Sequence, residues 1–343
     1  MSQAVVVLLY SSIVGLAMVT SAGAIFGALV TRRALKKQFS YIDIRLTNAR
    51  MRVARSLLAS GSRNGLVAVC AMAAFQSDVI VVSAFLGSTS LAAYGVAVRA
   101  STTVRSLSLR ATDMLVPTFA HSGAKREDAR TRAAIVESIF LTRAILILAL
   151  ILLLAFGSPL LHLWLGAVPR GANMVLVLFV LGAIISAPGY TCFVFLTGMD
   201  RLGLILVGTV SAAVANLSLS ALFTWKFGII GPVLGSIIAW TVWDMLILPR
   251  RVASEFHIPW LPTSFGGFRD LSLPATAGAL AGLAVVELLD WRSPSQALPG
   301  MFLVTIIYLG TASVTIGRER RQRYGTLARG IAGRSTRGTG DEL

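Results

Sequence analysis

The sequence is poor in charged residues, cysteine and histidine, and each shortage excludes a class of protein. Only 13% of its 343 residues are Asp, Glu, Lys or Arg, about half the share found in soluble domains. The two cysteines, Cys70 and Cys192, lie in apolar runs, where we expect small buried side chains rather than a disulfide framework. The three histidines are scattered, and no glycine-rich phosphate loop is present. We therefore expect no metal site, no cofactor, no catalytic residues and no enzyme activity.

Long hydrophobic runs dominate what remains. Hydrophobic residues make up 55% of the chain, and the mean hydropathy is +0.77. A helix needs about 20 mainly apolar residues to cross a bilayer. This criterion predicts an all-α, polytopic transmembrane helical bundle. Its expected spans, about nine in number, cover residues 4–30, 56–86, 90–120, 134–156, 171–199, 204–225, 229–248, 271–290 and 298–317.

Basic residues outnumber acidic ones, and their distribution predicts the orientation. The chain carries 31 Lys and Arg against 15 Asp and Glu, a net charge of +16. Most basic residues lie in alternate loops and in the C-terminal tail, whereas the opposite loops hold only Arg170, Lys226 and Arg292. Positive loops stay in the cytoplasm. We therefore expect a multi-pass protein of the cytoplasmic membrane, with its tail in the cytoplasm, its N-terminus outside and no nucleic-acid partner.

Two polar segments flank the hydrophobic region. Residues 31–55 form a basic cytoplasmic linker that is either an amphipathic segment on anionic lipid or a plain positive anchor. Residues 318–343 are rich in Arg, Gly, Ser and Thr, a composition that predicts a disordered cytoplasmic tail. Neither segment predicts a separately folded domain.

Polar residues in the third predicted span share one helical face. They recur at intervals of three and four residues, a spacing that aligns side chains along a helix. The stripe comprises Arg99, Thr102, Thr103, Ser106, Arg110 and Asp113. Because a charge costs about 2.5–3.5 kcal/mol near the bilayer centre, such a stripe must line a cavity or a polar helix contact. We expect Arg105 to lie on another face.

Arginine is also the commonest charged residue in the other spans. Arg63 and Arg143 lie in the second and fourth predicted spans, and with the stripe they predict a cationic, substrate-binding cavity. Guanidinium groups bind phosphate in a bidentate geometry, so an anionic cargo is expected. Structural ion pairs remain the alternative. Asp113 is three residues from Arg110 and is a candidate partner for it, and Asp78 and Asp113 are candidates for either ion pairs or proton coupling.

Several short motifs resemble those of a known transporter group. In chain order they are DVIVVSAFLG at 78–87, LAAYGVAVR at 91–99, LVPTFA at 115–120, LLHLWLG at 160–166, LTGMDR at 196–201, NLSL at 216–219 and FGIIGPVLG at 227–235. Their order and spacing resemble bacterial polysaccharide flippases of the multidrug/oligosaccharidyl-lipid/polysaccharide exporter superfamily. Members of that superfamily have two six-helix lobes around a central cavity, often followed by two extra helices.

The resemblance implies a domain layout for this chain. Residues 1–30 are expected to hold the last helix of an incomplete first lobe, followed by the linker at 31–55. Residues 56–249 would be the second six-helix lobe. Residues 250–317 would be a cytoplasmic loop and the two extra helices, before the tail.

The resemblance also implies a function. The cargo would be an undecaprenyl-pyrophosphate-linked oligosaccharide, flipped from the inner to the outer leaflet for assembly of a cell-surface polysaccharide. Expected partners are this anionic lipid, membrane lipids, a polysaccharide polymerase with other assembly proteins, and a subunit that supplies the first lobe. Two alternatives stay open: a drug/cation antiporter of the same superfamily, and a non-transporting structural subunit of an envelope-polymer assembly.

Overall fold

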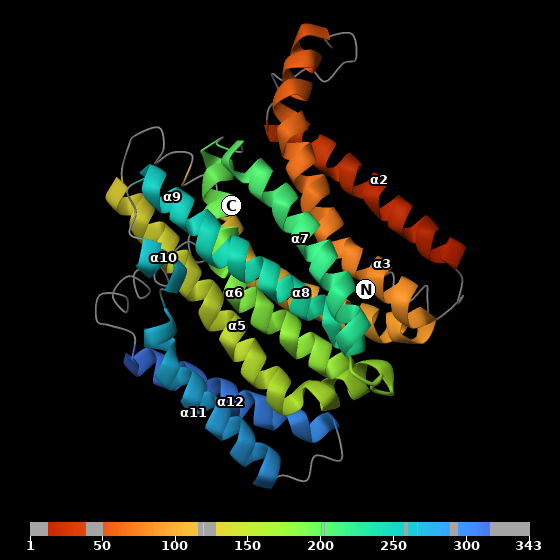
Figure 1. The fold of residues 1–343 in the computed structure, drawn as a ribbon, viewed down its shortest axis with the longest axis vertical. Coiled ribbons are helices and arrows are strands. Elements are labelled where there is room, and N and C mark those ends of the chain that lie inside the picture. The colour runs from red at the N-terminus through yellow and green to blue at the C-terminus, as the bar shows by residue number, and fades with distance from the viewer. Residues whose placement is uncertain are drawn as a thin grey trace, which may run out of the picture. The chain divides into compact units, whose positions relative to one another are not determined.

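The regular structure of the chain is helical. A computed structural model describes residues 13–38, 51–115, 119, 128–199, 201, 203–256, 260–265, 267–288 and 294–315. Every regular element in these ranges is a helix, which confirms the predicted all-α class. The chain divides into two compact units, residues 1–62 and 63–343, and each is described by itself (Figure 1).

The first unit contains α2 (Ile13–Gln38) and the opening turns of α3 (Met51–Asp113). α2 continues past the predicted span end at residue 30, because the apolar run marks only the membrane-embedded part of a helix. Most of its described side chains are exposed, Phe26 among them. Residues 39–50 of the predicted linker lie outside the described residues.

α3 reverses direction at Gly87 and thereby provides two of the predicted spans. Gly87 has φ 78° and ψ −177°, which breaks an otherwise helical stretch of 63 residues. The Tyr94 hydroxyl donates to the Asp78 carboxylate across 3.2 Å. In a straight helix, residues 16 positions apart are separated by about 24 Å. The chain therefore folds back here, at the predicted boundary between residues 86 and 90.

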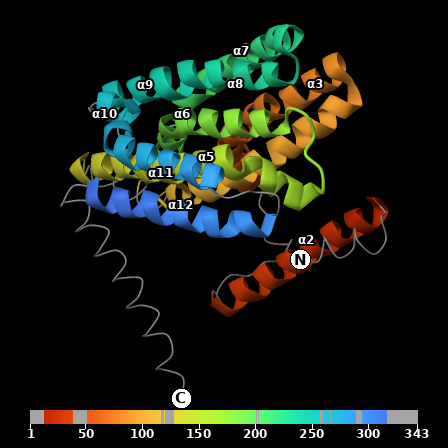
Figure 2. The ribbon, with the colours of Figure 1, turned by 90° about the horizontal axis from the view of Figure 1, so that it is seen from below.

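The second unit is built around α6 (Ala172–Gly198), which is largely buried. α6 packs against α5 (Asp128–Leu165) on one side. On the other side it packs against α8 (Gly231–Trp240) and the π-helix η3 (Thr241–Ile247), which continues into α9 (Leu248–Phe256). α7 (Gly203–Phe227) runs beside α8, joined to it by the 3₁₀ turn η2 (Gly228–Ile230). Figure 2 shows α7, α8 and α9 as one layer over α6.

Two further helices, α11 (Phe268–Leu288) and α12 (Pro294–Thr315), follow the short α10 (Trp260–Phe265). They lie side by side against α5 (Figure 2). Small residues allow this approach, since a Cβ added at Gly282 would meet the Ala155 methyl at 3.3 Å. The Tyr308 hydroxyl adds a hydrogen bond of 2.9 Å to the Ala144 carbonyl of α5.

Loops at the two ends of the second unit group as the basic residues predict. Arg201 forms an ion pair of 3.7 Å with Glu255, which joins two loops predicted to be cytoplasmic. At the other end, a Cβ at Gly171 would lie 3.0 Å from the Ile229 side chain. The two sets of loops thus lie at opposite ends. Which end faces the cytoplasm stays a prediction.

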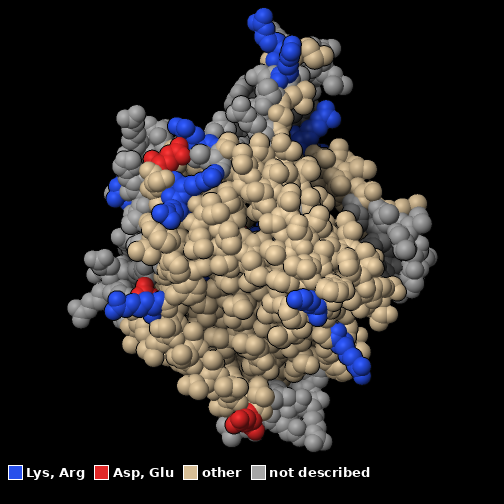
Figure 3. Space-filling view, in the orientation of Figure 1, with Lys and Arg blue, Asp and Glu red and all other residues tan. Residues whose placement is uncertain are grey.

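Six helical stretches within the described residues are apolar and long enough to cross a bilayer. They are Gln76–Arg110, Thr131–Leu165, Ala172–Gly198, Ile205–Phe256, Phe268–Glu287 and Ala297–Thr315. The fourth includes the turn between α7 and α8, so it passes twice. Figure 3 shows one face on which charged side chains are few and separated by wide uncharged areas. These observations confirm a polytopic membrane protein.

The backbone at Gly87 gives the first testable prediction. Its φ and ψ fall in a region open almost only to glycine, and nothing lies within 4 Å of an added Cβ. Gly87→Ala should therefore destabilise the fold by about 1–3 kcal/mol through backbone strain alone. Gly95, in the same helix with equally open space, is the matched control, and Gly95→Ala should stabilise by about 0.4–1 kcal/mol. Thermal unfolding of the purified variants measures both, and equal shifts in the same direction would contradict the explanation.

Candidate functional site

A polar pocket of about 380 Å³ lies between the second half of α3 and α6. Six of its lining residues come from α3, and the seventh, Tyr190, comes from α6. The lining comprises Thr102, Arg105, Ser106, Leu109, Arg110, Asp113 and Tyr190. Two guanidinium groups and one carboxylate thus meet in a pocket within a membrane-spanning helix pair.

Tyr190 connects the charged groups of the polar pocket. Its hydroxyl donates a hydrogen bond of 2.5 Å to the Asp113 carboxylate. The Arg105 guanidinium lies 5.9 Å from the centre of the Tyr190 ring, within cation–π range. The sequence suggested Arg110 as the partner of Asp113, but the structure gives Asp113 this tyrosine instead. Arg110 is an exposed side chain and faces the pocket.

The hydroxyl side chains of the stripe bond to their own helix. Thr102 donates to the Val98 carbonyl at 2.5 Å, and Ser106 donates to the Thr103 carbonyl at 2.9 Å. Each hydroxyl proton is therefore used within α3. The oxygen lone pairs remain to accept hydrogen bonds, so these groups suit a ligand that carries hydroxyl donors.

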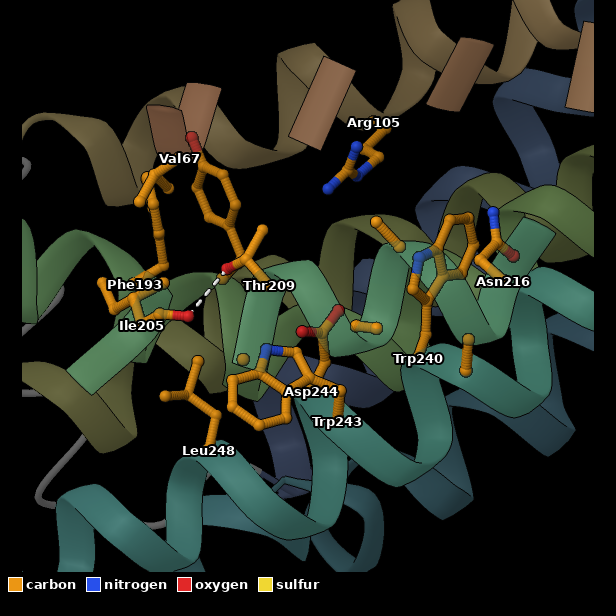
Figure 4. Close-up of a pocket in the computed structure, with 15 residues that line it drawn as sticks. Val67, Arg105, Phe193, Ile205, Thr209, Asn216, Trp240, Trp243, Asp244 and Leu248 are labelled. Atoms are coloured by element: carbon orange, nitrogen blue, oxygen red, sulfur yellow. Dashed lines mark hydrogen bonds between the residues drawn. The ribbon is translucent and has the colours of Figure 1, made fainter. Parts of the chain in front are cut away.

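A second, apolar pocket of about 250 Å³ lies among α3, α6, α7, α8, η3 and the start of α9. Its lining comprises Val67, Arg105, Gly189, Tyr190, Phe193, Ile205, Thr209, Ala212, Ala213, Asn216, Ala239, Trp240, Trp243, Asp244 and Leu248. Figure 4 shows Arg105 pointing into it from α3 and Asp244 from the opposite side. These two attract each other electrostatically. Arg105 and Tyr190 line both pockets.

Glycines and the π-helix place Asp244 in the apolar pocket. A Cβ at Gly189 would lie 2.3 Å from the Cβ of Asp244, so only glycine permits this approach of α6 and η3. Similarly, a Cβ at Gly208 would overlap the Trp243 ring. A π-helical turn shifts the following side chains relative to an α-helix, and such turns are frequent at functional sites. Asp244 lies in the centre of this one.

Asp78 is in a buried hydroxyl cage beside the apolar pocket and lines neither pocket itself. Its side chain is 2% exposed. Ser220 of α7 donates to one carboxylate oxygen at 2.7 Å. Ser236 of α8 donates to the other at 2.8 Å, and Tyr94 shares that oxygen at 3.2 Å. Asn216 of α7 adds a side-chain hydrogen bond. One carboxylate thus ties together both halves of α3, α7 and α8.

Arg143 corrects a sequence prediction. It was expected in the cavity, but its side chain is fully buried and contacts other elements. Its Nη2 donates to the Ser264 carbonyl at 2.6 Å, and its guanidinium carbon lies 4.2 Å from the centre of the Phe268 ring. Its Nε donates to the Ile184 carbonyl at 3.4 Å. In an α-helix that carbonyl would accept from residue 188, which here is proline and has no N–H. Arg143 therefore satisfies a carbonyl that Pro188 leaves open, and it joins α5 and α6 to the C-terminal helices.

The other predicted site residues divide into three groups. The structure brings Thr102, Ser106, Arg110 and Asp113 together in the polar pocket. Arg99 and Thr103 are exposed on the same helix and do not line it. The side chain of Arg63 lies outside the described residues. Among the described residues, no group of three or more His, Cys, Asp or Glu is arranged to hold a metal ion.

Sequence reasoning missed Arg105, Tyr190 and Asp244. The pocket side of α3 is rotated by about 40°, roughly a ninth of a turn, from the centre of the predicted stripe, which brings Arg105 in. Arg99 precedes the lining residues along the helix. One signal for this pair was present in the sequence. Arg105 and Asp244 both lie inside apolar spans, where each charged side chain needs a partner.

Comparison with known proteins shows a shared fold. No protein-family model and no curated protein matches the sequence. Among solved structures, the lipid II flippase MurJ in an inward closed conformation is similar, with a TM-score of 0.65 and 15% sequence identity. The match covers 90% of this chain and 63% of that chain, so this chain spans less than two thirds of the flippase. At this identity the likeness establishes the fold alone.

The role of Arg143 yields a double-mutant prediction. Arg143→Met leaves the carbonyls of Ile184 and Ser264 without their guanidinium donor, at a cost of roughly 1–3 kcal/mol each. In a Pro188→Ala background, the new N–H can bond to the Ile184 carbonyl. The same Arg143→Met change should then cost measurably less. Thermal unfolding of the four proteins tests this, and an equal loss in both backgrounds would show that the arginine does not serve the proline break.

Proposed function

We propose that the chain forms the second lobe of a transporter that flips an undecaprenyl-pyrophosphate-linked oligosaccharide from the inner to the outer leaflet, for assembly of a cell-surface polysaccharide. The observation that carries the proposal is the polar pocket, in which Arg105 and Arg110 face a space lined by hydroxyls inside a membrane-spanning lobe. Such a site is costly in lipid unless a polar ligand or water uses it.

The charges of the polar pocket fit a pyrophosphate. Arginine presents a planar fork of donors that matches phosphate oxygens. Among the described residues that line the pocket, one carboxylate, Asp113, faces two arginines and accepts a hydrogen bond from Tyr190. The lining therefore carries a net positive charge that attracts an anion. Thr102 and Ser106 offer acceptor oxygens to sugar hydroxyls on the same ligand. Arg99, exposed on the same helix, extends the basic surface beyond the pocket.

The charge balance does not favour a drug/cation antiporter. A cationic drug needs an acidic or aromatic site without competing cations. Among the described residues, Asp113 is the one acidic group that lines the polar pocket, and two arginines line the same space. An anionic cargo is therefore the better fit.

The shared fold supports a translocation mechanism. The structural match covers 90% of this chain and 63% of a lipid II flippase with the same fold. We propose alternating access, in which this lobe rocks against a first lobe around a central site. That first lobe belongs either to the same polypeptide or to a separate subunit, and it provides the wall opposite the polar pocket.

The first experiment measures the leaflet in which lipid-linked oligosaccharides accumulate. Spheroplasts depleted of the protein are probed with an impermeant lectin or glycan-oxidising reagent. A flippase predicts that depletion traps the intermediate on the inner leaflet and reduces the polymer. An unchanged outer-leaflet signal with normal polymer would refute the proposal and favour a structural role.

Charge reversal in the polar pocket tests the pyrophosphate site. Arg110→Glu should abolish restoration of the outer-leaflet signal in depleted cells, because it places a second carboxylate beside Asp113 and repels phosphate. Lys226→Glu reverses an exposed charge outside both pockets and should restore transport fully. The amount of each protein in the membrane fraction is the control for insertion. Normal transport by a fully inserted Arg110→Glu protein would contradict the proposed site.

Asp78 is our candidate for the group that couples transport to protons. It is a buried carboxylate, and the hydrogen bonds it accepts from the described residues come from neutral hydroxyls and an amide. Asp78→Asn keeps an acceptor oxygen for these donors but can neither carry nor release a charge. We expect this variant to unfold within a few degrees of the parent protein and to lose transport. Asp78→Ala should lose both, at roughly 1–3 kcal/mol for each polar group left unpaired. An Asp78→Asn protein that transports normally would assign Asp78 a purely structural role.

A further inference from the structure

The proposed head-group site does not use the apolar pocket, yet the two pockets share two lining residues. Arg105 and Tyr190 line both pockets. From this adjacency we infer that the apolar pocket is a subsite for the prenyl segment next to the pyrophosphate of the cargo. The inference rests on the proposed function, because it assumes that a phosphate occupies the polar pocket.

The lining of the apolar pocket matches a branched, unsaturated hydrocarbon. Aromatic rings come from three helical segments, as Phe193, Trp240 and Trp243, and alanines and aliphatic side chains complete the wall. Ligand pockets of this kind are mainly apolar, with a few polar groups that fix the orientation of the ligand. Here the charged groups are Arg105 and Asp244, which face each other across the space (Figure 4).

The size of the pocket limits what enters. Pockets for whole drug-sized ligands measure about 300–1,000 Å³, and this one measures about 250 Å³. It therefore admits a short length of chain rather than a complete polyprenyl lipid. The first prenyl units beside the phosphate are the part of the cargo that must lie next to the polar pocket.

Arg105 lies where the two parts of such a ligand join. A polyprenyl pyrophosphate changes from charged to apolar over one bond, and the change from polar to apolar lining occurs at Arg105 and Tyr190. The Arg105 guanidinium is attracted by Asp244. A phosphate bound at Arg105 offers a second anionic partner, while the hydrocarbon beside it covers the surrounding rings.

Tight packing keeps the pocket preformed. The Trp243 ring lies directly against Gly208, where an added Cβ would overlap the ring. The Trp240 ring is held in the same way against Gly182 on α6. Because the two rings are fixed by backbone contacts, ligand binding needs little ordering of the pocket walls.

Photo-crosslinking tests the subsite. The purified full chain, in phosphatidylcholine nanodiscs, is labelled with farnesyl pyrophosphate that carries a diazirine on its first prenyl unit. We expect the label on peptides that contain residues 205–216 of α7 and 189–193 of α6. Ala213→Phe fills the pocket and should raise the probe concentration needed for half-maximal labelling at least about tenfold. Ala215→Phe, at an exposed position of the same helix outside the pocket, should leave that concentration unchanged.

Competition separates failure of the subsite from failure of the proposed function. Inorganic pyrophosphate should displace the probe in the parent protein, and Arg110→Glu should weaken this displacement. If pyrophosphate displaces the probe but Ala213→Phe has no effect, the prenyl subsite is wrong and the head-group site stands. If diazirine-labelled farnesol marks the same peptides equally well, the pocket accepts any bilayer chain and the inference is overturned. If pyrophosphate does not displace the probe, the proposed head-group site fails.

Discussion

Polar groups inside the bilayer find no water, so each must be satisfied within the protein. This constraint explains the buried polar contacts of the second unit. Asp78 is surrounded by donors from α3, α7 and α8, so its carboxylate fixes three helical segments relative to one another. Arg143 completes the hydrogen bonding that Pro188 interrupts in α6. In both cases a costly buried charge becomes a joint between helices that are distant in sequence.

The same constraint explains the place of the candidate site. The polar face of α3 packs partly against Tyr190 and leaves Arg110 exposed beside it. A guanidinium on such a face is stabilised only if water, a charged neighbour or an anionic ligand reaches it. In the polar pocket, Arg110 lies near the carboxylate of Asp113, and both line a space between α3 and α6. The polar pocket therefore forms entirely within the second unit, from α3 and α6.

The sequence predicts the helices better than it predicts the site. Apolar runs about 20 residues long identify spans because helix and bilayer lengths match, and Gly87 marks the reversal of α3 where the motif DVIVVSAFLG ends. Helical periodicity brings Thr102, Ser106 and Arg110 together correctly, because their spacing is local. It fails for Arg105 and Asp244, which come together only because α3 and η3 line the same pocket. A π-helical turn also does not follow the spacing of an α-helix. Arg143 was misplaced for a similar reason, since its role depends on a proline 45 positions further along the chain.

Arg105 connects the polar pocket with the apolar pocket, because it lines both. Its guanidinium faces the polar pocket and is also attracted by Asp244, which η3 holds against Gly189 of α6. An anion bound at Arg105 therefore competes with Asp244 for the same charge. A ligand shifts a conformational equilibrium only if it interacts differently with the two states, and this shared guanidinium provides such a difference. An anion in the polar pocket would thereby change the charge balance around Asp244, at the contact between α6 and η3.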